Sequence, residues 1–259
     1  MFKTLLYEVR DGVATITLNR PEVYNACNNE LTFELQDAIK EAAKDNLVRV
    51  VVFTGSGKAF CSGQDLKDAA SQGVRSYMDS VFKRYNPIIR GLRNLPKPVI
   101  CRLNGVAAGA GCSLALACDI IIAAETASLT EAFISIGLVT DSGSSYFLPR
   151  LIGYSKAFEM ATMPRKIPAQ EAFTMGLVNR VVPAEQLDAA IKEATDYYAN
   201  APTKAIGLMK KMLNRSFNSD LETILEMEAY SQEIAGNTKD HKEGVMAFIE
   251  KRKPVFKGE

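Results

Sequence analysis

Apolar and polar residues alternate on both sides of Asp11-Gly12, over residues 3–10 and 13–19, and this pattern predicts a β-hairpin with a two-residue turn. Asn28 or Asn29 can cap a helix that extends to about Lys44, because apolar residues recur there at helical spacing. Residues 48–54 (VRVVVFT) are almost continuously apolar, which favours a strand buried on both faces.

Strand and helix patterns continue to alternate through the middle of the chain. The remaining predicted elements are a loop at 55–65, a helix at about 76–95, strands at 98–103 and 119–124, a glycine-rich loop at 104–112, and a small-residue helix that ends near residue 117. This order indicates several parallel strands joined by helices. After Pro183 the pattern becomes helical, with four segments, and the third begins with Ser219 and Glu222 at capping-box spacing.

The overall composition narrows the class of protein. Of 259 residues, 47% are hydrophobic and 24% charged, as in a soluble globular protein. The 31 basic and 30 acidic residues leave a net charge of +1, which gives no electrostatic signature of a nucleic-acid partner or an acidic membrane. No apolar run approaches the roughly 18 residues that span a bilayer, and the N-terminus does not resemble a signal peptide, so we expect a cytoplasmic protein.

Cysteine and histidine usage restricts the chemistry further. The five cysteines are odd in number and show no CxxC pairing, which is typical of reduced and mostly buried thiols. His241 is the only histidine, and it lies in a polar stretch near the C-terminus. A histidine-rich metal site is therefore excluded, and we expect no metal centre.

The two glycine-containing loops are the main candidates for a functional site. Each lies between a buried strand and a helix, where glycine lets backbone approach a ligand and the first helical N–H groups lack internal partners. One N–H from each loop, converging on one point, would form an oxyanion hole. The alternative is that the small residues only permit tight packing, and spacing alone leaves both interpretations open. Neither G-x-G-x-x-G nor G-x-x-x-x-G-K-[ST] occurs, which argues against a nucleotide site.

Ordered sequence blocks that span nearly the whole chain carry a family resemblance. They are Asn19-Arg20-Pro21, residues 58–66 (KAFCSGQDL), 96–100 (PKPVI), 104–111 (NGVAAGAG), 148–153 (LPRLIG) and 243–252 (EGVMAFIEKR). These blocks resemble the signature of the crotonase (enoyl-CoA hydratase/isomerase) superfamily. The resemblance implies an α/β fold, namely a crotonase-type spiral of repeated ββα units with a helical C-terminal oligomerisation region. Residues 1–200 would form the core with the active site, and residues 201–259 the trimerisation region.

The resemblance also assigns site residues by position. The oxyanion-hole donors fall on the N–H groups of Gln64 and Ala110, where alanine replaces the more usual glycine and favours a negative φ. A coenzyme A thioester would bind against Val23, Ser62, Gln64, Asp65, Leu66, Lys67, Ala110 and Phe133, and a neighbouring subunit would add Phe248 and Lys251. The implied partners are the acyl-CoA substrate and further copies of the chain, in a homo-trimer or a hexamer of two trimers. Coenzyme A is part of the substrate, and no separate cofactor is expected. Residues 245–252 also follow the apolar stripe of an amphipathic surface helix.

The distribution of carboxylates separates the reactions of the family. Family hydratases use two glutamates at positions that Ser113 and Phe133 occupy here, so ordinary hydration lacks an evident general base. Family isomerases carry one acidic residue at the position of Asp141, and Phe133 would then form an apolar wall that excludes water. Burial is expected to raise the pKa of Asp141. Asp141 also fits a helix N-cap pattern, and Glu131 is an alternative base or else a solvent-facing or loop-bonding acid.

The resemblance therefore favours an acyl-CoA isomerase that moves a double bond or proton through a thioester enolate, with Asp141 as the single acid/base. Tyr85-Asn86-Pro87 and Asp141 resemble the epoxyphenylacetyl-CoA isomerases of phenylacetate catabolism, whereas residues 144–147 depart from that group. A Δ3,Δ2-enoyl-CoA isomerase of fatty-acid metabolism uses the same machinery. The alternatives are an enoyl-CoA hydratase or thioester-cleaving enzyme, and a non-catalytic CoA-binding scaffold subunit.

Overall fold

The N-terminal hairpin forms as its alternation predicts. In the computed structural model, which describes residues 2–71 and 76–259, β1 (Leu5–Arg10) pairs antiparallel with β2 (Val13–Leu18). Asp11 and Gly12 both have positive φ, 51° and 79°, as a two-residue turn matched to the strand twist requires. Alternate residues of β2 are buried, so a shift of one residue in the pairing would expose the apolar face.

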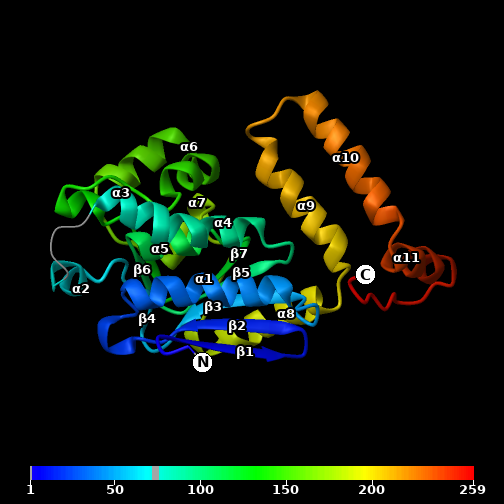
Figure 1. Ribbon diagram of the computed structural model, residues 1–259, viewed down its shortest axis with the longest axis horizontal. Helices are drawn as coiled ribbons and strands as arrows, with labels where there is room; N and C mark the ends of the chain where they lie inside the picture. Colours follow the sequence, from blue (N-terminus) through cyan, green and yellow to red (C-terminus); the bar gives the residue numbers. More distant parts are fainter. Residues whose placement is uncertain (1, 72–75) are drawn as a thin grey trace.

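The strands build two sheets (Figure 1). The larger has the order β1-β2-β3-β5-β7-β10, in which β3 is Val50–Gly55, β5 is Val99–Leu103, β7 is Ile120–Ala124 and β10 is Arg180–Val182. The smaller has the order β4-β6-β8-β9, comprising Ala59–Cys61, Val106–Ala108, Ser128–Thr130 and Ile167–Pro168. Every pair in the larger sheet beyond the hairpin is parallel, as is expected when helices join the strands.

The path of the chain between the sheets repeats three times. The consecutive strands β3 and β4, then β5 and β6, then β7 and β8, each place one strand in the larger sheet and the next in the smaller. Helical segments follow each pair of strands. After the first and second pairs the chain returns to the larger sheet, and after the third pair the repeats end. The predicted α/β class and the spiral of repeated ββα units are confirmed.

The helices of the first repeat follow their sequence signals closely. The helix α1 (Asn29–Lys44) begins after Asn28, whose side chain accepts a hydrogen bond from the Leu31 N–H at 2.9 Å. The helix predicted at about 76–95 is present as three consecutive segments, α3 (Tyr77–Ser80), the π-helical η2 (Val81–Tyr85) and α4 (Asn86–Asn94). A π-helical turn of this kind is often found at a functional site.

The other segments of the core are shorter, apart from α6. They are η1 (Pro21–Val23), α2 (Leu66–Ser71), α5 (Ala110–Leu116), η3 (Phe133–Ile136), α6 (Ser144–Thr162), α7 (Ala169–Met175) and η4 (Ala184–Gln186). Within α6, Gly153 has φ 75° and ψ 163°, so two helical stretches meet there at a break. The central helix α5 is buried along its whole length, which its small residues allow.

Four helices end the chain, as predicted: α8 (Leu187–Ala199), α9 (Thr203–Ser216), α10 (Leu221–Gly236) and α11 (Lys239–Ile249). Figure 1 shows α9, α10 and α11 extending away from the sheets. The capping prediction for α10 is wrong by one residue, because Asp220 rather than Ser219 accepts the Thr223 N–H, at 2.8 Å. The proposed division between residues 1–200 and 201–259 stays a prediction.

The helix α9 is held to the core by a buried lysine. The Lys210 ammonium group donates to the Asp119 carboxylate at 2.6 Å and to the Leu92 carbonyl oxygen at 2.8 Å. Burial lowers the pKa of Lys210, and the neighbouring Asp119 carboxylate opposes that shift. The sequence suggested no such role, because Lys210 precedes another lysine in a helix with a polar face.

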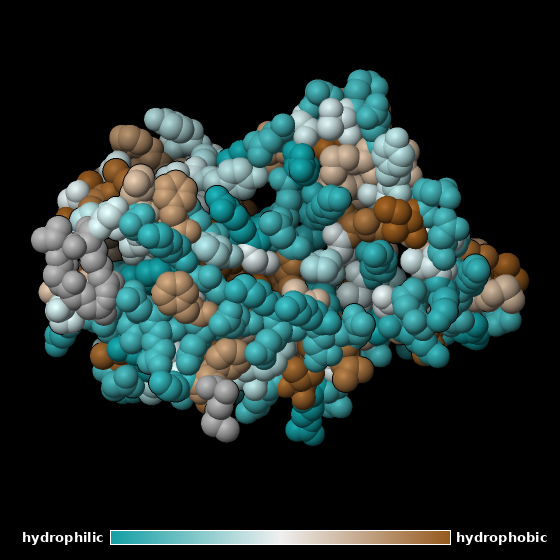
Figure 2. All heavy atoms as spheres, viewed as in Figure 1, coloured by the Kyte–Doolittle hydropathy of each residue, from teal (hydrophilic) through white to brown (hydrophobic). Residues whose placement is uncertain are grey.

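The projecting helices leave apolar side chains exposed. Figure 2 shows patches of brown, apolar atoms among hydrophilic ones over this C-terminal part of the molecule. The exposed large apolar residues of α10 and α11 are Leu221, Leu225, Tyr230, Ile234, Val245, Met246, Phe248 and Ile249. So many exposed apolar side chains on two helices are typical of an interaction surface. Within the described ranges, none of the helices is both long and apolar enough to cross a membrane.

Candidate active site

The two glycine-containing loops meet in the structure. Gly63 has φ +91°, and a Cβ at this residue would lie 2.7 Å from the Ala108 carbonyl oxygen and 3.4 Å from the Ala110 nitrogen. Only glycine adopts this conformation at little cost and allows so close an approach. The loop that leaves β4 is therefore packed directly on the loop that begins α5.

Hydrogen bonds on either side of Gln64 leave its own N–H available. The Cys27 N–H donates to the Gly63 carbonyl at 2.7 Å, and the Asp65 N–H donates to the Cys27 carbonyl at 3.0 Å. Among the described residues, no acceptor pairs with the Gln64 N–H, which lies between these two bonds. A ligand oxygen could take that position, as an oxyanion hole requires.

The second predicted donor lies at the start of α5. Gly109 is the N-cap residue, with no side-chain cap, and Ala110 is the first helical residue, so the Ala110 N–H has no partner within the helix. The φ angle of Ala110 is not positive, which confirms the negative φ that was predicted for an alanine at this position. A side chain on Gly111 would collide with the Cys61 carbonyl oxygen, so the glycines also serve close packing. The close-packing interpretation of the glycine run is confirmed, and the oxyanion-hole interpretation stays a prediction.

The side chain of Gln64 is tied to the protein interior. Its Nε2 donates to the Cys27 carbonyl at 3.0 Å, and its Oε1 accepts from the Tyr85 hydroxyl at 2.7 Å. Tyr85 ends the π-helical turn, and burial raises the pKa of its hydroxyl well above the usual value, so it is a neutral donor. Sequence patterns alone did not reveal that Tyr85 orients Gln64, because the two residues lie 21 positions apart.

The residues predicted to contact coenzyme A surround the first loop. The Ser62 hydroxyl donates to the Val23 carbonyl at 3.2 Å, which places Val23 beside the loop, and Leu66 and Lys67 are exposed in α2. Asp65 differs, because its side chain is buried and turned inward. One of its oxygens accepts the Asp68 N–H at 3.1 Å, at the start of α2, and the other pairs with Arg20 at 3.0 Å.

The side chain of Asp65 therefore has a structural role, which is independent of any contact between the Asp65 backbone and coenzyme A. Burial alone would raise its pKa, but the Asp68 N–H and the Arg20 guanidinium together hold the pKa below its usual value. The Asp65 carboxylate stays ionised at neutral pH and fixes the loop that carries Gln64.

Asp141 lies on the loop between η3 and α6, next to the centre of α5. Its backbone carbonyl accepts a hydrogen bond from the Ser113 hydroxyl at 3.1 Å, and its carboxylate accepts from the Ser142 hydroxyl at 2.7 Å. Burial raises the pKa of Asp141 and the Ser142 hydrogen bond opposes that shift, so the predicted direction is confirmed. The alternative N-cap interpretation is wrong, because Gly143 is the N-cap residue of α6 and the Asp141 carboxylate caps nothing.

Ser113 and Phe133 are the residues that the sequence resemblance places at the two hydratase glutamate positions, which stays a prediction. Ser113 is fully buried in α5, and Phe133 begins η3, with a ring carbon 4.0 Å from the position of a Cβ on Gly109. Phe133 is thus an apolar side chain beside the start of α5. The structure brings Gln64, Ala110 and Asp141 to this region from three separate parts of the chain.

Glu131 is not the solvent-facing acid that one sequence interpretation offered. It has no exposed surface, and its Oε1 lies within hydrogen-bond distance of the Ser144 hydroxyl, at 2.8 Å. Burial raises its pKa to about 7, whereas the Ser144 and Cys112 side chains lower it by less. The residues of β8 that directly precede Glu131 are Ser-Leu-Thr, a mostly polar run that gave no sign of this placement.

Comparison with known proteins agrees with this architecture. The family described as Enoyl-CoA hydratase/isomerase matches residues 8–259. The chain belongs to this family. It is 40% identical, over the full length of both chains, to an Escherichia coli protein named 1,2-epoxyphenylacetyl-CoA isomerase. It is also 41% identical to a Rhodobacter capsulatus protein named "probable enoyl-CoA hydratase", with 99% of each chain covered. The crystal structure of an enoyl-CoA hydratase from Bacillus anthracis superimposes with a TM-score of 0.93 at 37% identity, covering 99% of this chain and all of that one.

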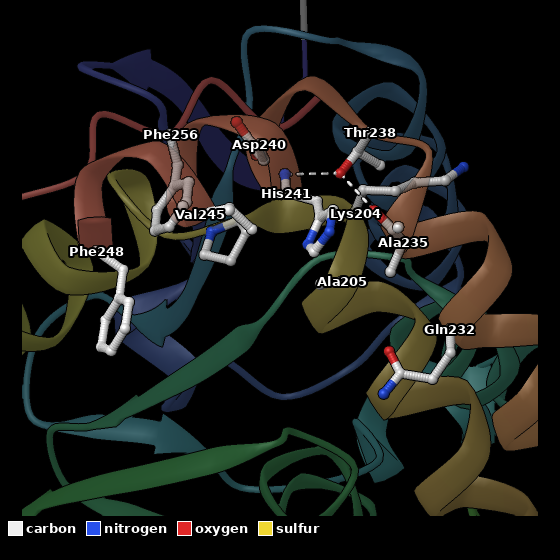
Figure 3. Close-up of a pocket in the computed structure, with 13 residues that line it drawn as sticks. Lys204, Ala205, Gln232, Ala235, Thr238, Asp240, His241, Val245, Phe248 and Phe256 are labelled. Carbon is white, nitrogen blue, oxygen red and sulfur yellow. Dashed lines mark hydrogen bonds between the residues drawn. The ribbon is translucent and has the colours of Figure 1, made fainter. Parts of the chain in front are cut away.

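The two C-terminal residues predicted for coenzyme A binding lie outside the active-site region of this hydratase/isomerase family member. Phe248 is 86% exposed on α11 and lines a pocket of about 670 Å³ between α9, α10 and α11, and Lys251 follows the end of α11. Figure 3 shows Phe248, Val245 and Phe256 on one side of this pocket and Gln232 on the other. The pocket includes His241 but none of Gln64, Ala110 and Asp141. Any contact of Phe248 with coenzyme A would thus involve another subunit.

No metal centre is evident in this family member. Over residues 2–71 and 76–259, no three His, Cys, Asp or Glu side chains are grouped so that they could hold an ion. The five cysteines are buried and unpaired, as the sequence predicts for reduced thiols.

Proposed function

We propose that the chain is an acyl-CoA isomerase that shifts a proton through a thioester enolate, with Asp141 as its single acid/base. The observation that carries this proposal is the identity of two residues around α5, Ser113 and Phe133. Ser113 and Phe133 supply no carboxylate, and Asp141 presents one of raised pKa on the neighbouring loop. A single carboxylate beside an apolar side chain suits proton transfer that excludes water.

The proposed reaction begins with the thioester oxygen between the N–H groups of Gln64 and Ala110. The Asp141 carboxylate takes the proton from the carbon α to the thioester carbonyl, and the electrons of the broken C–H bond form the enolate. The two N–H groups stabilise the negative charge on the enolate oxygen. The protonated Asp141 then donates the same proton to the γ carbon, so the double bond moves and Asp141 returns to its ionised form. No water or redox partner enters the reaction.

Substrate binding is proposed to use the coenzyme A contacts predicted from the sequence. Val23, Ser62, Leu66 and Lys67 lie together at the loop that carries Gln64. Because Phe248 and the apolar residues of α10 and α11 are exposed, we propose a trimer or a hexamer of two trimers in which these helices pack on a neighbouring subunit.

The proposal is tested with a panel of 3-enoyl-CoA substrates of different chain length and an aryl acetyl-CoA analogue. Wild type should form the 2-enoyl-CoA product, and Asp141→Asn should lower kcat by about a thousandfold, because a positioned acid/base contributes roughly 10² to 10⁴ in rate. Asp37→Asn, which changes an exposed carboxylate of α1, is the matched control and should keep wild-type activity. Unchanged isomerisation in Asp141→Asn would show that the mechanism is wrong.

Hydration is the second candidate, because a relative of 41% identity bears a hydratase name and Glu131 supplies a second buried carboxyl group nearby. Crotonyl-CoA distinguishes the two. Hydration at ordinary enzyme rates would contradict the argument from Ser113 and Phe133. A chain that binds no acyl-CoA in calorimetry would instead support the non-catalytic scaffold.

A further inference from the structure

Three oxygen-bearing side chains form a continuous buried chain behind Asp141. The Glu131 Oε1 lies 2.8 Å from the Ser144 hydroxyl, which lies 2.7 Å from the Ser113 hydroxyl. Ser113 in turn lies 3.1 Å from the Asp141 carbonyl oxygen. All three side chains are fully buried, and they come from the segment after β8, the start of α6 and the middle of α5. The chain thus links the three elements that surround the proposed acid/base.

A count of hydrogens determines the charge of this chain. Three oxygen–oxygen contacts need three hydrogens, and the hydroxyls of Ser113 and Ser144 supply two. The Asp141 carbonyl can only accept, so Ser113 donates to it and Ser144 must donate to Ser113. The contact between Ser144 and Glu131 then requires a hydrogen on the Glu131 carboxyl. If Glu131 is ionised, one of the three contacts is left without a hydrogen.

The surroundings of Glu131 favour the protonated form for an independent reason. The titratable groups that face it are the Cys112 thiol of α5 and the Asp141 carboxylate, and no lysine or arginine of the described residues acts on it. Its Oε2 has no nitrogen or oxygen donor among the described residues, which an ionised carboxylate would need. Burial and the Asp141 charge raise its pKa to about 7.

We propose that Glu131 is a positioning residue, whose protonated carboxyl holds the backbone of Asp141 in place through Ser144 and Ser113. Ionisation of Glu131 turns the Ser144 hydroxyl toward the new carboxylate. Ser113 must then donate to Ser144 and leave the Asp141 carbonyl with the Ser144 N–H as its one remaining donor among the described residues, or else face the Ser144 oxygen without a hydrogen between them. This inference rests on the proposed role of Asp141 for its effect on catalysis, but not for the protonation of Glu131.

The first test is the pH dependence of kcat with 3-hexenoyl-CoA. At pH 8, one unit above the pKa, about a tenth of Glu131 is protonated, so wild-type kcat should fall up to about tenfold from its value near pH 6. In Glu131→Gln the side-chain amide donates to Ser144 at every pH, so this decline should disappear and the variant should exceed wild type at pH 8. A merely structural role of Glu131 would not produce this reversal.

Two further variants keep the test decisive if Glu131→Gln folds poorly. Ser113→Ala removes the side-chain donor to the Asp141 carbonyl and leaves the Ser144 N–H, so kcat should fall severalfold at pH 6 and lose the decline toward pH 8. Ser128→Ala is the matched control, because it removes another buried serine hydroxyl that makes no hydrogen bond in the described structure. It should keep both the wild-type kcat and the wild-type pH profile.

Infrared difference spectroscopy of the wild-type protein between pH 6 and pH 8 tests the protonation without any substrate. The carbonyl band of a protonated carboxyl group should be present at pH 6 and absent from Glu131→Gln. Absence of that band in wild type overturns the inference, as does a Glu131→Gln variant that keeps the alkaline decline. If Asp141→Asn is fully active, the proposed function fails, and the infrared band still decides the state of Glu131.

Discussion

Replacing Glu131 with glutamine should remove a pH dependence of stability that arises from the buried carboxyl group. The pKa of Glu131 is raised from 4.5 to about 7 in the folded protein. Between these two values the folded protein keeps a proton that the unfolded chain has lost. The free energy of unfolding of wild type must therefore fall as pH rises through this interval, and level off above it.

The size of the effect follows from the two pKa values. Each pKa unit corresponds to about 1.4 kcal/mol, so the full loss is about 3 kcal/mol, most of which falls between pH 5 and pH 8. Glutamine does not titrate and can donate to Ser144 as the protonated carboxyl does. Glu131→Gln should therefore gain about 2 to 3 kcal/mol relative to wild type between these two pH values, whatever its stability at pH 5.

The assay is urea denaturation at pH 5 and pH 8, followed by far-ultraviolet circular dichroism because the chain has no tryptophan. Protein concentration must be the same throughout, since subunit association adds to apparent stability. Glu41→Gln, an exposed change on α1, is the control and should parallel wild type. Parallel curves for wild type and Glu131→Gln would refute the reasoning, because they would mean that Glu131 titrates alike in the folded and unfolded chains.

Three further substitutions test other parts of the structure. Gly63→Ala should destabilise the protein by about 2 kcal/mol or more in thermal unfolding and lower kcat, because a side chain at φ +91° would meet the Ala108 carbonyl. Lys210→Met should cost about 2 kcal/mol in urea denaturation by removing one of the two cations that pair with the half-buried Asp119 carboxylate, whereas the exposed neighbour Lys211→Met should change stability by less than about 0.5 kcal/mol. Phe248→Asp should reduce the assembly to smaller species in sedimentation velocity, and an unchanged sedimentation coefficient would exclude α11 from the interface.

Local patterns in the sequence predicted the first five strands of the larger sheet and most of the long helices, but no strand of the smaller sheet, whose β4 and β6 lie within the loops expected at 55–65 and 104–112. The hairpin turn at Asp11-Gly12 and the Asn28 cap of α1 depend on residues within a few positions, and both are present as predicted. The cap of α10 was wrong by one residue because Ser219 and Asp220 both suit an N-cap, and spacing alone cannot choose between them.

The burial of charged side chains could not be predicted in the same way. The Lys210 ammonium group is bound by Asp119, which lies 91 positions earlier in the chain. The Glu131 carboxyl group contacts Ser144, the first residue of α6. Each of these residues looked like an ordinary polar position, because its own neighbours in sequence give no sign of the partner. Only the fold shows that both are enclosed, and the cost of enclosing them explains why each has a specific hydrogen-bond partner.

The candidate site combines groups whose positions are fixed in different ways. Backbone packing positions the N–H groups of Gln64 and Ala110, because Gly63 and Gly111 have no side chain and let the two loops lie in direct contact. The Asp141 loop depends in part on side chains, since the Asp141 carbonyl accepts from the Ser113 hydroxyl as well as from the Ser144 N–H. A glutamate at position 113, where the sequence resemblance places a hydratase glutamate, would leave that carbonyl without its side-chain donor and would place a second acid beside Glu131. Asp141, Ser113 and Ser144 therefore form one unit with Glu131, and restoring a hydratase glutamate alone should damage isomerisation without creating hydration.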